Sequence, residues 1–301
     1  MRPGFLTFDD PRGSGLRHYP ADTHLLAWLD ARGIEFDVLT DEDLDDEGIA
    51  LLRPYRAILT GSHPEYHTEG TLDALAEYTR TGGRLAYLGG NGFYWRVARD
   101  KAMPWAIELR RTEGGVRTWA AEPAEYYHQL DGQYGGLWRR NRRPPQELAG
   151  VGFSGQGAFE GTYYRLLPAA RDPAHAWIFD GIEGDILGDH GLSGGGAAGF
   201  ELDRADTDLG TPYDAAILAR SENPPASFFT VPEEVLAGRR TLTGERLEDL
   251  MRAEIVYFRT QGGGEVFSVG SITFCGSLWR GGWDGDVSRL LGNVVRRFSA
   301  P

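Results

Sequence analysis

The chain has 301 residues, 41% of them hydrophobic and 25% charged, a balance that excludes a disordered or fibrous protein. The net charge is −13, and an acidic surface repels nucleic acid and anionic lipid, so neither is an expected partner. No apolar run reaches the ~18 residues of a membrane span, and no basic-then-apolar leader opens the sequence. The single cysteine, Cys275, excludes an internal disulfide and a Cys-rich zinc site, which fits a reducing cytoplasm.

The first 95 residues alternate between short apolar stretches and segments in which apolar side chains recur at helical spacing. The predicted elements are, in chain order, a strand over 4–8, a helix over 24–31, a strand over 34–39, a short helix over 41–47, a strand over 56–60, a helix over 71–80 and a strand over 84–88. This alternation predicts βαβ units and a parallel sheet. Ligands of such sheets bind beyond the carboxyl ends of the strands, so the loops at 61–66 and 89–95 are the first places to look for a site.

Residues 100–200 lose this rhythm and are dense in glycine, proline and aromatic residues, with short predicted strands such as 177–180. We interpret them as a long, loop-rich insertion that decorates the sheet. Order returns with strands over 254–259 and 265–274, which form a β-hairpin, and with a closing amphipathic helix over 286–298. The whole chain, 1–301, is therefore predicted to be a single α/β domain with a parallel, flavodoxin-like sheet.

Two loops at the predicted strand ends carry polar side chains. His63, Glu65, Tyr66 and His67 in the first, with Tyr94 in the second, could make an acid/base or metal site. Alternatively, His63 and Glu65 only close a turn before the next helix. The glycines at 89–92 indicate a tight turn of the kind that carries a nucleophile in other α/β proteins, but no Cys or Ser stands there. Cys275 lies in a predicted apolar strand and is expected to pack in the core.

Tyrosine is the unusual residue of this sequence. There are 13 tyrosines, several of them in glycine-rich loops: Tyr66, Tyr94, Tyr126, Tyr127, Tyr134, Tyr163 and Tyr164. A hard trivalent cation can deprotonate a phenol, and carboxylate and phenolate oxygens together suit a ferric ion better than zinc. The alternative is that these tyrosines are packing residues with a hydroxyl group to satisfy.

Several long segments resemble a known family, in the same order along the chain. They are residues 60–66, 87–95, 131–139, 194–203 and 270–278. Together they are similar to the C-terminal domain of the large (beta) subunit of N,N-dimethylformamidase. The resemblance covers nearly the whole chain and implies a class I glutamine amidotransferase-like fold that lacks the catalytic cysteine of that fold.

The resemblance also implies hydrolysis of a small amide, as dimethylformamide is hydrolysed to dimethylamine and formate. It further implies a mononuclear Fe(III) ion held by two tyrosines and one glutamate. By motif, Tyr94 matches the first ligand, Tyr134 the second and Glu201 the carboxylate, with Tyr66 as the alternative to Tyr134.

Glu65 or His63 would then act as the catalytic group that carries a proton to the leaving amine. The family's large subunit has a further N-terminal region and works with a small subunit, so this chain is either a stand-alone relative, or that region or a companion subunit is supplied elsewhere. We also expect a homo-oligomer in the cytoplasm. The alternative function is a non-catalytic α/β module that binds a partner subunit or a small ligand.

Overall fold

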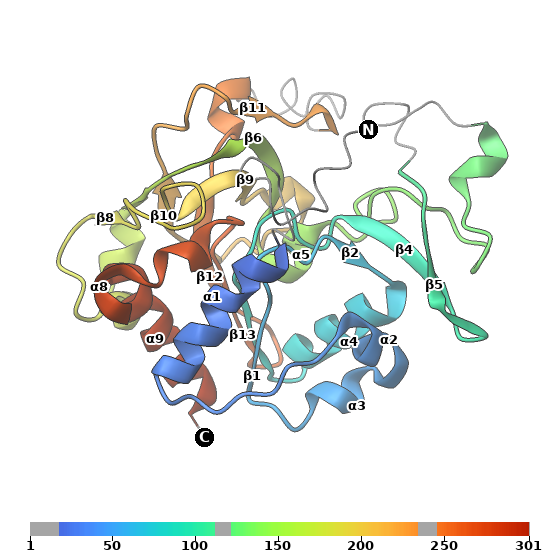
Figure 1. Ribbon diagram of the computed structural model, residues 1–301, viewed down its shortest axis with the longest axis horizontal. Helices are drawn as coiled ribbons and strands as arrows, with labels where there is room; N and C mark the ends of the chain where they lie inside the picture. Colours follow the sequence, from blue (N-terminus) through green and yellow to red (C-terminus); the bar gives the residue numbers. More distant parts are fainter. Residues whose placement is uncertain (1–17, 112–121, 234–245, 301) are drawn as a thin grey trace, which may run out of the picture.

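A computed structural model describes residues 18–111, 122–233 and 246–300. Its main feature is a seven-stranded sheet in the order β1-β3-β13-β12-β10-β7-β8 (Figure 1). The strands are β1 (Ala57–Leu59), β3 (Arg84–Tyr87), β7 (Tyr164–Leu166), β8 (Ile186–Leu187), β10 (Ala216–Ser221), β12 (Glu254–Arg259) and β13 (Glu265–Ser268). The segment over 100–200 thus supplies two strands of the main sheet, while the prediction of one domain with a decorating insertion stays a prediction.

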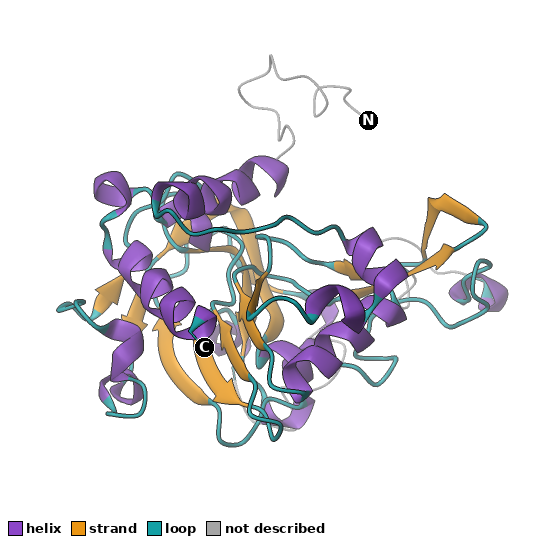
Figure 2. Ribbon diagram, turned by 90° about the horizontal axis from the view of Figure 1, so that it is seen from below, coloured by secondary structure: helices purple, strands orange, loops and turns teal. Residues whose placement is uncertain are grey.

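Two smaller sheets flank the main one. The first has the order β11-β6-β9 and the second has the order β2-β4-β5. Their strands are β2 (Tyr66–His67), β4 (Trp95–Asp100), β5 (Met103–Leu109), β6 (Gly152–Thr162), β9 (Ala198–Arg204) and β11 (Phe229–Thr230). Figure 2 shows curved strands rather than one flat layer.

The α-helices cover the main sheet or connect its strands. They are α1 (His18–Ala31), α2 (Asp41–Glu47), α3 (Ile49–Leu52), α4 (Glu69–Arg80), α5 (Pro145–Ala149), α8 (Arg280–Trp283) and α9 (Asp286–Ser299). Short 3₁₀ helices lie at η2 (Pro123–Tyr126), η3 (Pro168–Arg171), η4 (Ala176–Phe179), η5 (Thr207–Leu209), η6 (Leu247–Leu250) and η7 (Phe274–Ser277). The Thr40 side chain accepts the Asp43 N–H in a capping box at the start of α2.

The main sheet has a hydrophobic cluster on each face, because side chains alternate along a strand. On β3, Leu85 and Tyr87 pack with the helices α2, α3 and α4. Ala86 and the following Leu88 pack with α1 and α9 on the opposite face. The helices predicted over 24–31, 41–47, 71–80 and 286–298 are confirmed, since each amphipathic segment has a sheet face to cover.

The predicted parallel, flavodoxin-like sheet is wrong. In the main sheet only β1–β3 and β3–β13 are parallel pairs, whereas β13–β12, β12–β10, β10–β7 and β7–β8 are antiparallel. The sheets are mixed and mostly antiparallel, so they do not support the amidotransferase-like fold. The hairpin β12–β13 inserts beside β3, a long-range pairing that local periodicity does not reveal.

Three predicted strands also differ from the structure. Residues 34–39 form an extended connection without a strand partner in the part of the chain that the structure describes. Residues 177–180 lie largely in the 3₁₀ helix η4, and β13 ends at Ser268 rather than at 274. The strand predicted over 4–8 lies outside the described residues. Cys275 is buried as expected, but in η7 rather than in a strand, and burial raises the pKa of its thiol.

Candidate functional site: a buried acid cluster beside a tight turn

The tight turn after β3 brings distant strands very close together. A side chain at Gly89 would lie 2.5 Å from the Ser62 carbonyl oxygen, and one at Gly90 would lie 2.7 Å from the Glu201 carbonyl oxygen. Asn91 and Phe93 adopt positive φ angles of 52° and 56°, which are uncommon for residues other than glycine. The glycines are therefore required by close backbone approach, and the turn carries local strain.

Asp203 on β9 holds this turn in place. Its Oδ1 accepts the Asn91 N–H at 2.8 Å, and its Oδ2 accepts the Tyr87 hydroxyl at 2.7 Å. The Tyr87 hydroxyl oxygen in turn accepts the Gly92 N–H at 2.8 Å. These groups are buried, so each hydrogen bond removes the cost of an unsatisfied polar group and fixes the turn.

His63 lies beside the turn, between two carboxylates. Its Nε2 is 2.8 Å from Glu65 Oε2, and its Nδ1 is 3.1 Å from both the Gly90 carbonyl oxygen and Glu201 Oε2. Because both ring nitrogens face acceptors, only the doubly protonated imidazolium can donate from both. We call His63, Glu65, Glu201 and Asp203 the acid cluster.

The electrostatics of His63 and Glu65 describe an ion pair. Burial would lower the pKa of His63, but the hydrogen bond to Glu65 and the charges of Glu201 and Glu65 outweigh burial and raise it. Burial likewise would raise the pKa of Glu65, but the hydrogen bond and charge of His63 and the charge of Arg111 lower it. Both shifts favour the imidazolium–carboxylate form of the pair.

The other two carboxyl groups, those of Glu201 and Asp203, have pKa values raised toward neutral pH. Burial, with the charges of Glu65 and Asp203, raises the pKa of Glu201 to about 7, although His63 opposes this. Burial also raises the pKa of Asp203 to about 6. A carboxyl group with a pKa near the operating pH can both give and take a proton, which is the property of a general acid/base.

Tyr66 joins the cluster through Glu65. Its hydroxyl is hydrogen-bonded to the Glu65 carboxylate, and its surroundings include the charges of Arg111 and Glu201. Burial and Glu65 raise the pKa of this phenol. Tyr94 lies next to the same segment, because its backbone N–H donates to the Glu65 carbonyl oxygen at 3.0 Å. The buried Tyr94 ring meets the Phe153 ring edge-on, with centroids 5.3 Å apart.

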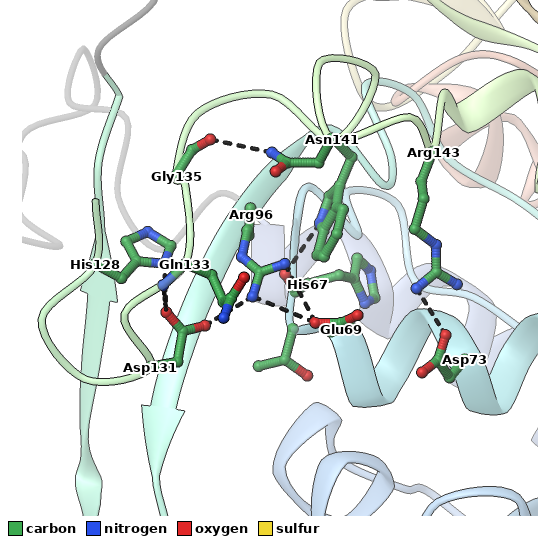
Figure 3. A network of polar contacts seen from close by, with 12 residues as sticks. His67, Glu69, Asp73, Arg96, His128, Asp131, Gln133, Gly135, Asn141 and Arg143 are labelled. Carbon is green, nitrogen blue, oxygen red and sulfur yellow. Dashed lines mark hydrogen bonds and ion pairs between the residues drawn. The ribbon is translucent and has the colours of Figure 1, made fainter. Parts of the chain in front are cut away.

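Tyr134 lies in a different aromatic group. Its ring is stacked on Tyr126, with centroids 6.0 Å apart, and meets Tyr127 edge-on at 5.6 Å. Its loop is held to β4 by Arg96, whose Nη2 lies 2.7 Å from Asp131 Oδ2 (Figure 3).

Arg96 is a buried arginine at the centre of a second polar group, whose acids Asp131 and Glu69 reach the surface. Its Nη2 also lies 3.4 Å from Glu69 Oε2, and its guanidinium group lies 4.9 Å from the centre of the Trp138 ring. His128 Nδ1 is 3.6 Å from Asp131 Oδ1 (Figure 3). We call Arg96, Glu69, Asp131 and His128 the Arg96 network.

The structure thus brings four of the sequence-derived candidates together: His63, Glu65, Tyr66 and Glu201. Sequence reasoning did not single out Asp203, Tyr87 or the side chain of Asn91, which hydrogen-bonds Glu201. One signal was present, since residues two apart on a strand share a face, so Glu201 and Asp203 had to lie side by side if residues 198–204 were a strand.

One feature of the acid cluster suits a hard metal cation, namely its buried carboxylate oxygens. Glu201 Oε2 is buried and lies 3.1 Å from His63 Nδ1, and carboxylate oxygens are hard-cation ligands. Among the residues in 18–111, 122–233 and 246–300, however, no group of three or more His, Cys, Asp or Glu side chains is arranged to hold a metal ion. The iron ligands implied by the resemblance, Tyr94, Tyr134 and Glu201, stay a prediction.

Comparison with known proteins gives the family. Residues 1–285 match the profile described as N,N-dimethylformamidase beta subunit-like, C-terminal. The chain belongs to this family. It is 42% identical over 280 residues to the N,N-dimethylformamidase beta subunit of Paracoccus aminophilus and 41% identical to that of an Alcaligenes species. These alignments cover 93% of this chain but only 36% of each relative.

A solved structure of a cytoplasmic protein from Salmonella typhimurium aligns with 93% of this dimethylformamidase-family chain and 88% of its own, with a TM-score of 0.44 and 14% identity. That likeness is too low to carry an argument. In the described part of the chain, every helix is too short or too polar to cross a bilayer.

Proposed function

We propose that this chain is the hydrolytic domain of a dimethylformamidase-like enzyme that cleaves the C–N bond of a small amide at the acid cluster. The observation that carries the proposal is the placement of His63 between Glu65 and Glu201, at 2.8 and 3.1 Å. The family membership supports the reaction class, because the relatives are named for it.

Hydrolysis adds a water oxygen to the carbonyl carbon, breaks the C–N bond and places a proton on the departing amine. In the metal-free site Glu201, with a pKa near 7, can accept a proton from the attacking water; with iron bound to Glu201, the Glu65 carboxylate would take this role. His63 carries a proton at Nδ1 and can deliver it to the amine nitrogen, while Glu65 keeps the imidazolium charged and oriented. The Gly90 carbonyl accepts from His63 Nδ1, and the Asn91 side chain is hydrogen-bonded to Glu201. These two contacts hold His63 and Glu201 in place beside each other.

The test is release of dimethylamine from dimethylformamide by the purified, iron-supplied chain, alone and with any companion polypeptide. We expect His63→Gln, Glu65→Gln and Glu201→Gln each to abolish turnover. Glu77→Gln is the matched control, because Glu77 lies on the exposed side of α4 and pairs only with Arg80 among the described residues. Turnover that survives all three cluster substitutions contradicts the proposal. A chain that hydrolyses no small amide under either condition favours the non-catalytic module instead.

We also propose that a mononuclear iron ion binds beside the cluster, held by Glu201 and Tyr94 with a second phenol. Iron would polarise the amide carbonyl as a Lewis acid and lower the pKa of water. For the second phenol we now favour Tyr66 over Tyr134, because the Tyr66 hydroxyl is hydrogen-bonded to Glu65, whereas the Tyr134 ring packs against Tyr126 and Tyr127.

Iron content and the visible absorption of ferric phenolate test this ligand set. We expect Tyr94→Phe, Tyr66→Phe and Glu201→Gln to lose iron and colour, and Tyr134→Phe to keep both. Loss in Tyr134→Phe instead of Tyr66→Phe, together with loss in Tyr94→Phe and Glu201→Gln, would restore the original assignment. If all three Tyr→Phe variants keep their iron, the phenol ligands are not among these three residues.

We further infer a companion polypeptide. The chain spans about a third of the length of its relatives, which are named as subunits. Co-expression with a polypeptide that supplies the part of the relatives that this chain does not cover should raise amide turnover. Unchanged turnover would contradict the inference. Location in the cytoplasm stays a prediction.

A further inference from the structure

A hollow lined with arginines lies at the start of β3, whereas the acid cluster lies beside the turn that follows this strand. The hollow encloses about 310 Å³, at the small end of the range for ligand sites. We call it the arginine pocket. The residues of its lining that carry the argument are Arg53, Tyr55, Arg56, Tyr78, Thr81 and Arg84. Among the described residues that line the pocket, none is acidic.

The arginines of the pocket are not matched by an equal number of acids. Glu265 Oε1 lies 3.4 Å from Arg84 Nε, but the same carboxylate lies 3.0 Å from Arg297 Nε through its Oε2. Arg53 and Arg56 form no ion pair within 18–111, 122–233 and 246–300. Their two positive charges are therefore left over, in a chain whose net charge is −13.

Capping of α9 accounts for only part of this arrangement. Arg56 Nη1 donates to the Ser299 carbonyl at 3.0 Å, and Arg84 Nη1 donates to the Phe298 carbonyl at 2.7 Å. These hydrogen bonds to the helix use only the Nη1 of each guanidinium group, which has further N–H donors. Arg53 takes no part in the cap, so its place in the pocket needs another explanation.

The floor of the pocket is closed and held in place. Tyr78 is 4% exposed, and its hydroxyl donates to the Tyr55 carbonyl at 3.0 Å. A side chain at Gly83 would begin 2.4 Å from the Tyr78 ring, so backbone and ring are in direct contact here. Because this floor is fixed before any ligand arrives, binding loses less conformational entropy.

We propose that the arginine pocket binds a small oxyanion with two negative charges, namely a phosphate group, either as the free ion or as a monoester. Guanidinium groups recognise phosphate through paired N–H···O hydrogen bonds, and Arg53, Arg56 and Arg84 reach the pocket from three different segments. The two charges left over on Arg53 and Arg56 match those of the anion. Since the acid cluster lies at the other end of β3, this ligand is not the amide substrate.

Isothermal titration of the full chain with inorganic phosphate at about pH 8, where phosphate carries close to two charges, tests the proposal. We expect saturable binding whose dissociation constant rises at least tenfold in Arg53→Gln, because a charge-assisted contact is lost. The control is Arg142→Gln, which removes an exposed arginine of the run 139–143 that has no ion pair within the described residues. This control should leave the dissociation constant unchanged.

Two further titrations define the ligand. Formate, with one charge, should bind at least tenfold more weakly than phosphate. Phenyl phosphate that binds more tightly than phosphate assigns the pocket to an ester, and weaker binding assigns it to the free ion. His63→Gln should bind phosphate as the parent does, so this proposal and that of amide hydrolysis fail separately. The absence of saturable binding up to about 10 mM phosphate, or an equal loss in Arg53→Gln and Arg142→Gln, overturns the proposal.

The location of the anion has its own test. Thr81 is exposed at the pocket, and Thr207 is exposed in η5. We expect phosphate to slow the reaction of iodoacetate with Thr81→Cys and not with Thr207→Cys. The native Cys275 is buried and adds no background. Equal rates with and without phosphate at Thr81→Cys, or equal slowing in both variants, would show that phosphate does not bind in the arginine pocket.

Discussion

The acid cluster and the Arg96 network both lie near β4, but the carboxyl groups of the acid cluster are buried, whereas the Asp131 and Glu69 side chains of the Arg96 network are 26% and 60% exposed. In the Arg96 network, Arg96 faces Asp131 at 2.7 Å, and although burial would raise the pKa of Asp131, Arg96 lowers it. In the acid cluster, burial raises the pKa values of Glu201 and Asp203 to about 7 and about 6, and His63 contacts only Glu65 and Glu201 of the three carboxyl groups.

This difference gives the two groups different roles: the Arg96 network contributes to stability, and the acid cluster is suited to chemistry. A carboxylate paired with an arginine contributes to folding and keeps its charge over a wide pH range. A carboxyl group buried with too little positive charge costs stability, but it is able to exchange a proton or to bind a cation near neutral pH. The comparison therefore predicts that substitutions in the acid cluster reduce activity, and that substitutions in the Arg96 network reduce stability.

The largest expected effect is the loss of turnover in His63→Gln. Removing a positioned acid/base group lowers the rate by about 10²- to 10⁴-fold, and glutamine keeps the size of the side chain. Dimethylamine release measures the rate, and thermal unfolding shows whether the variant is folded. A folded His63→Gln variant with undiminished turnover would place the proton transfer elsewhere.

Arg96→Met is expected to give the largest loss of stability. It removes the ion pairs of a buried arginine with Asp131 and Glu69, whose side chains are 26% and 60% exposed, so the expected cost is about 1 to 2 kcal/mol, between that of an exposed and that of a buried ion pair. Urea unfolding measures the change in the free energy of unfolding. Turnover per folded molecule should change much less than in His63→Gln. A stable but inactive Arg96→Met variant would contradict the assignment of the Arg96 network to stability.

Glu201→Gln should stabilise the metal-free chain at alkaline pH. Burial raises the pKa of Glu201 from 4.5 to about 7, so the folded chain binds more protons than the unfolded chain between these values. The free energy of unfolding of the parent therefore falls as the pH rises from about 4.5 to about 7. The variant should be more stable at pH 8 by on the order of 2 kcal/mol, with little difference below the unfolded pKa.

Urea unfolding at a series of pH values, with a chelator present, measures this effect. Asp208→Asn serves as an exposed carboxyl control, since Asp208 lies at the surface in η5. A gain of stability that is independent of pH would argue against a charged Glu201 as its cause.

The smallest expected effect is that of Arg143→Met. Arg143 Nη1 lies 2.7 Å from Asp73 Oδ1, but the Asp73 side chain is 66% exposed, and exposed ion pairs contribute about 0.5 kcal/mol or less. Calorimetric unfolding of this variant beside Arg96→Met compares two arginines that both lie over the Trp138 ring. A loss as large as that of Arg96→Met would show that ring contact, not burial of the ion pair, carries the stability.

The sequence identified most of the candidate residues, but it did not show which of them lie together in the fold. His63, Glu65 and Tyr66 are close in the chain, so their common loop was visible from the start. Glu201 lies beside them only because β9 passes close to the turn after β3. The approach is so close that a side chain at position 90 would clash with the Glu201 carbonyl oxygen. Tyr134 was assigned to the same site by motif, but its ring contacts lie with Tyr126 and Tyr127.

The sequence by itself determined the helices α1, α2, α4 and α9, because helical hydrogen bonds and apolar periodicity are local properties. It also determined the acidic character of the chain and its family. Only the tertiary structure decided the mixed, mostly antiparallel sheets, since strand pairing joins residues more than a hundred positions apart, as β13 beside β3 shows. The same long-range contacts bury His63, Glu65, Glu201 and Asp203 together, and the pKa values follow from that burial.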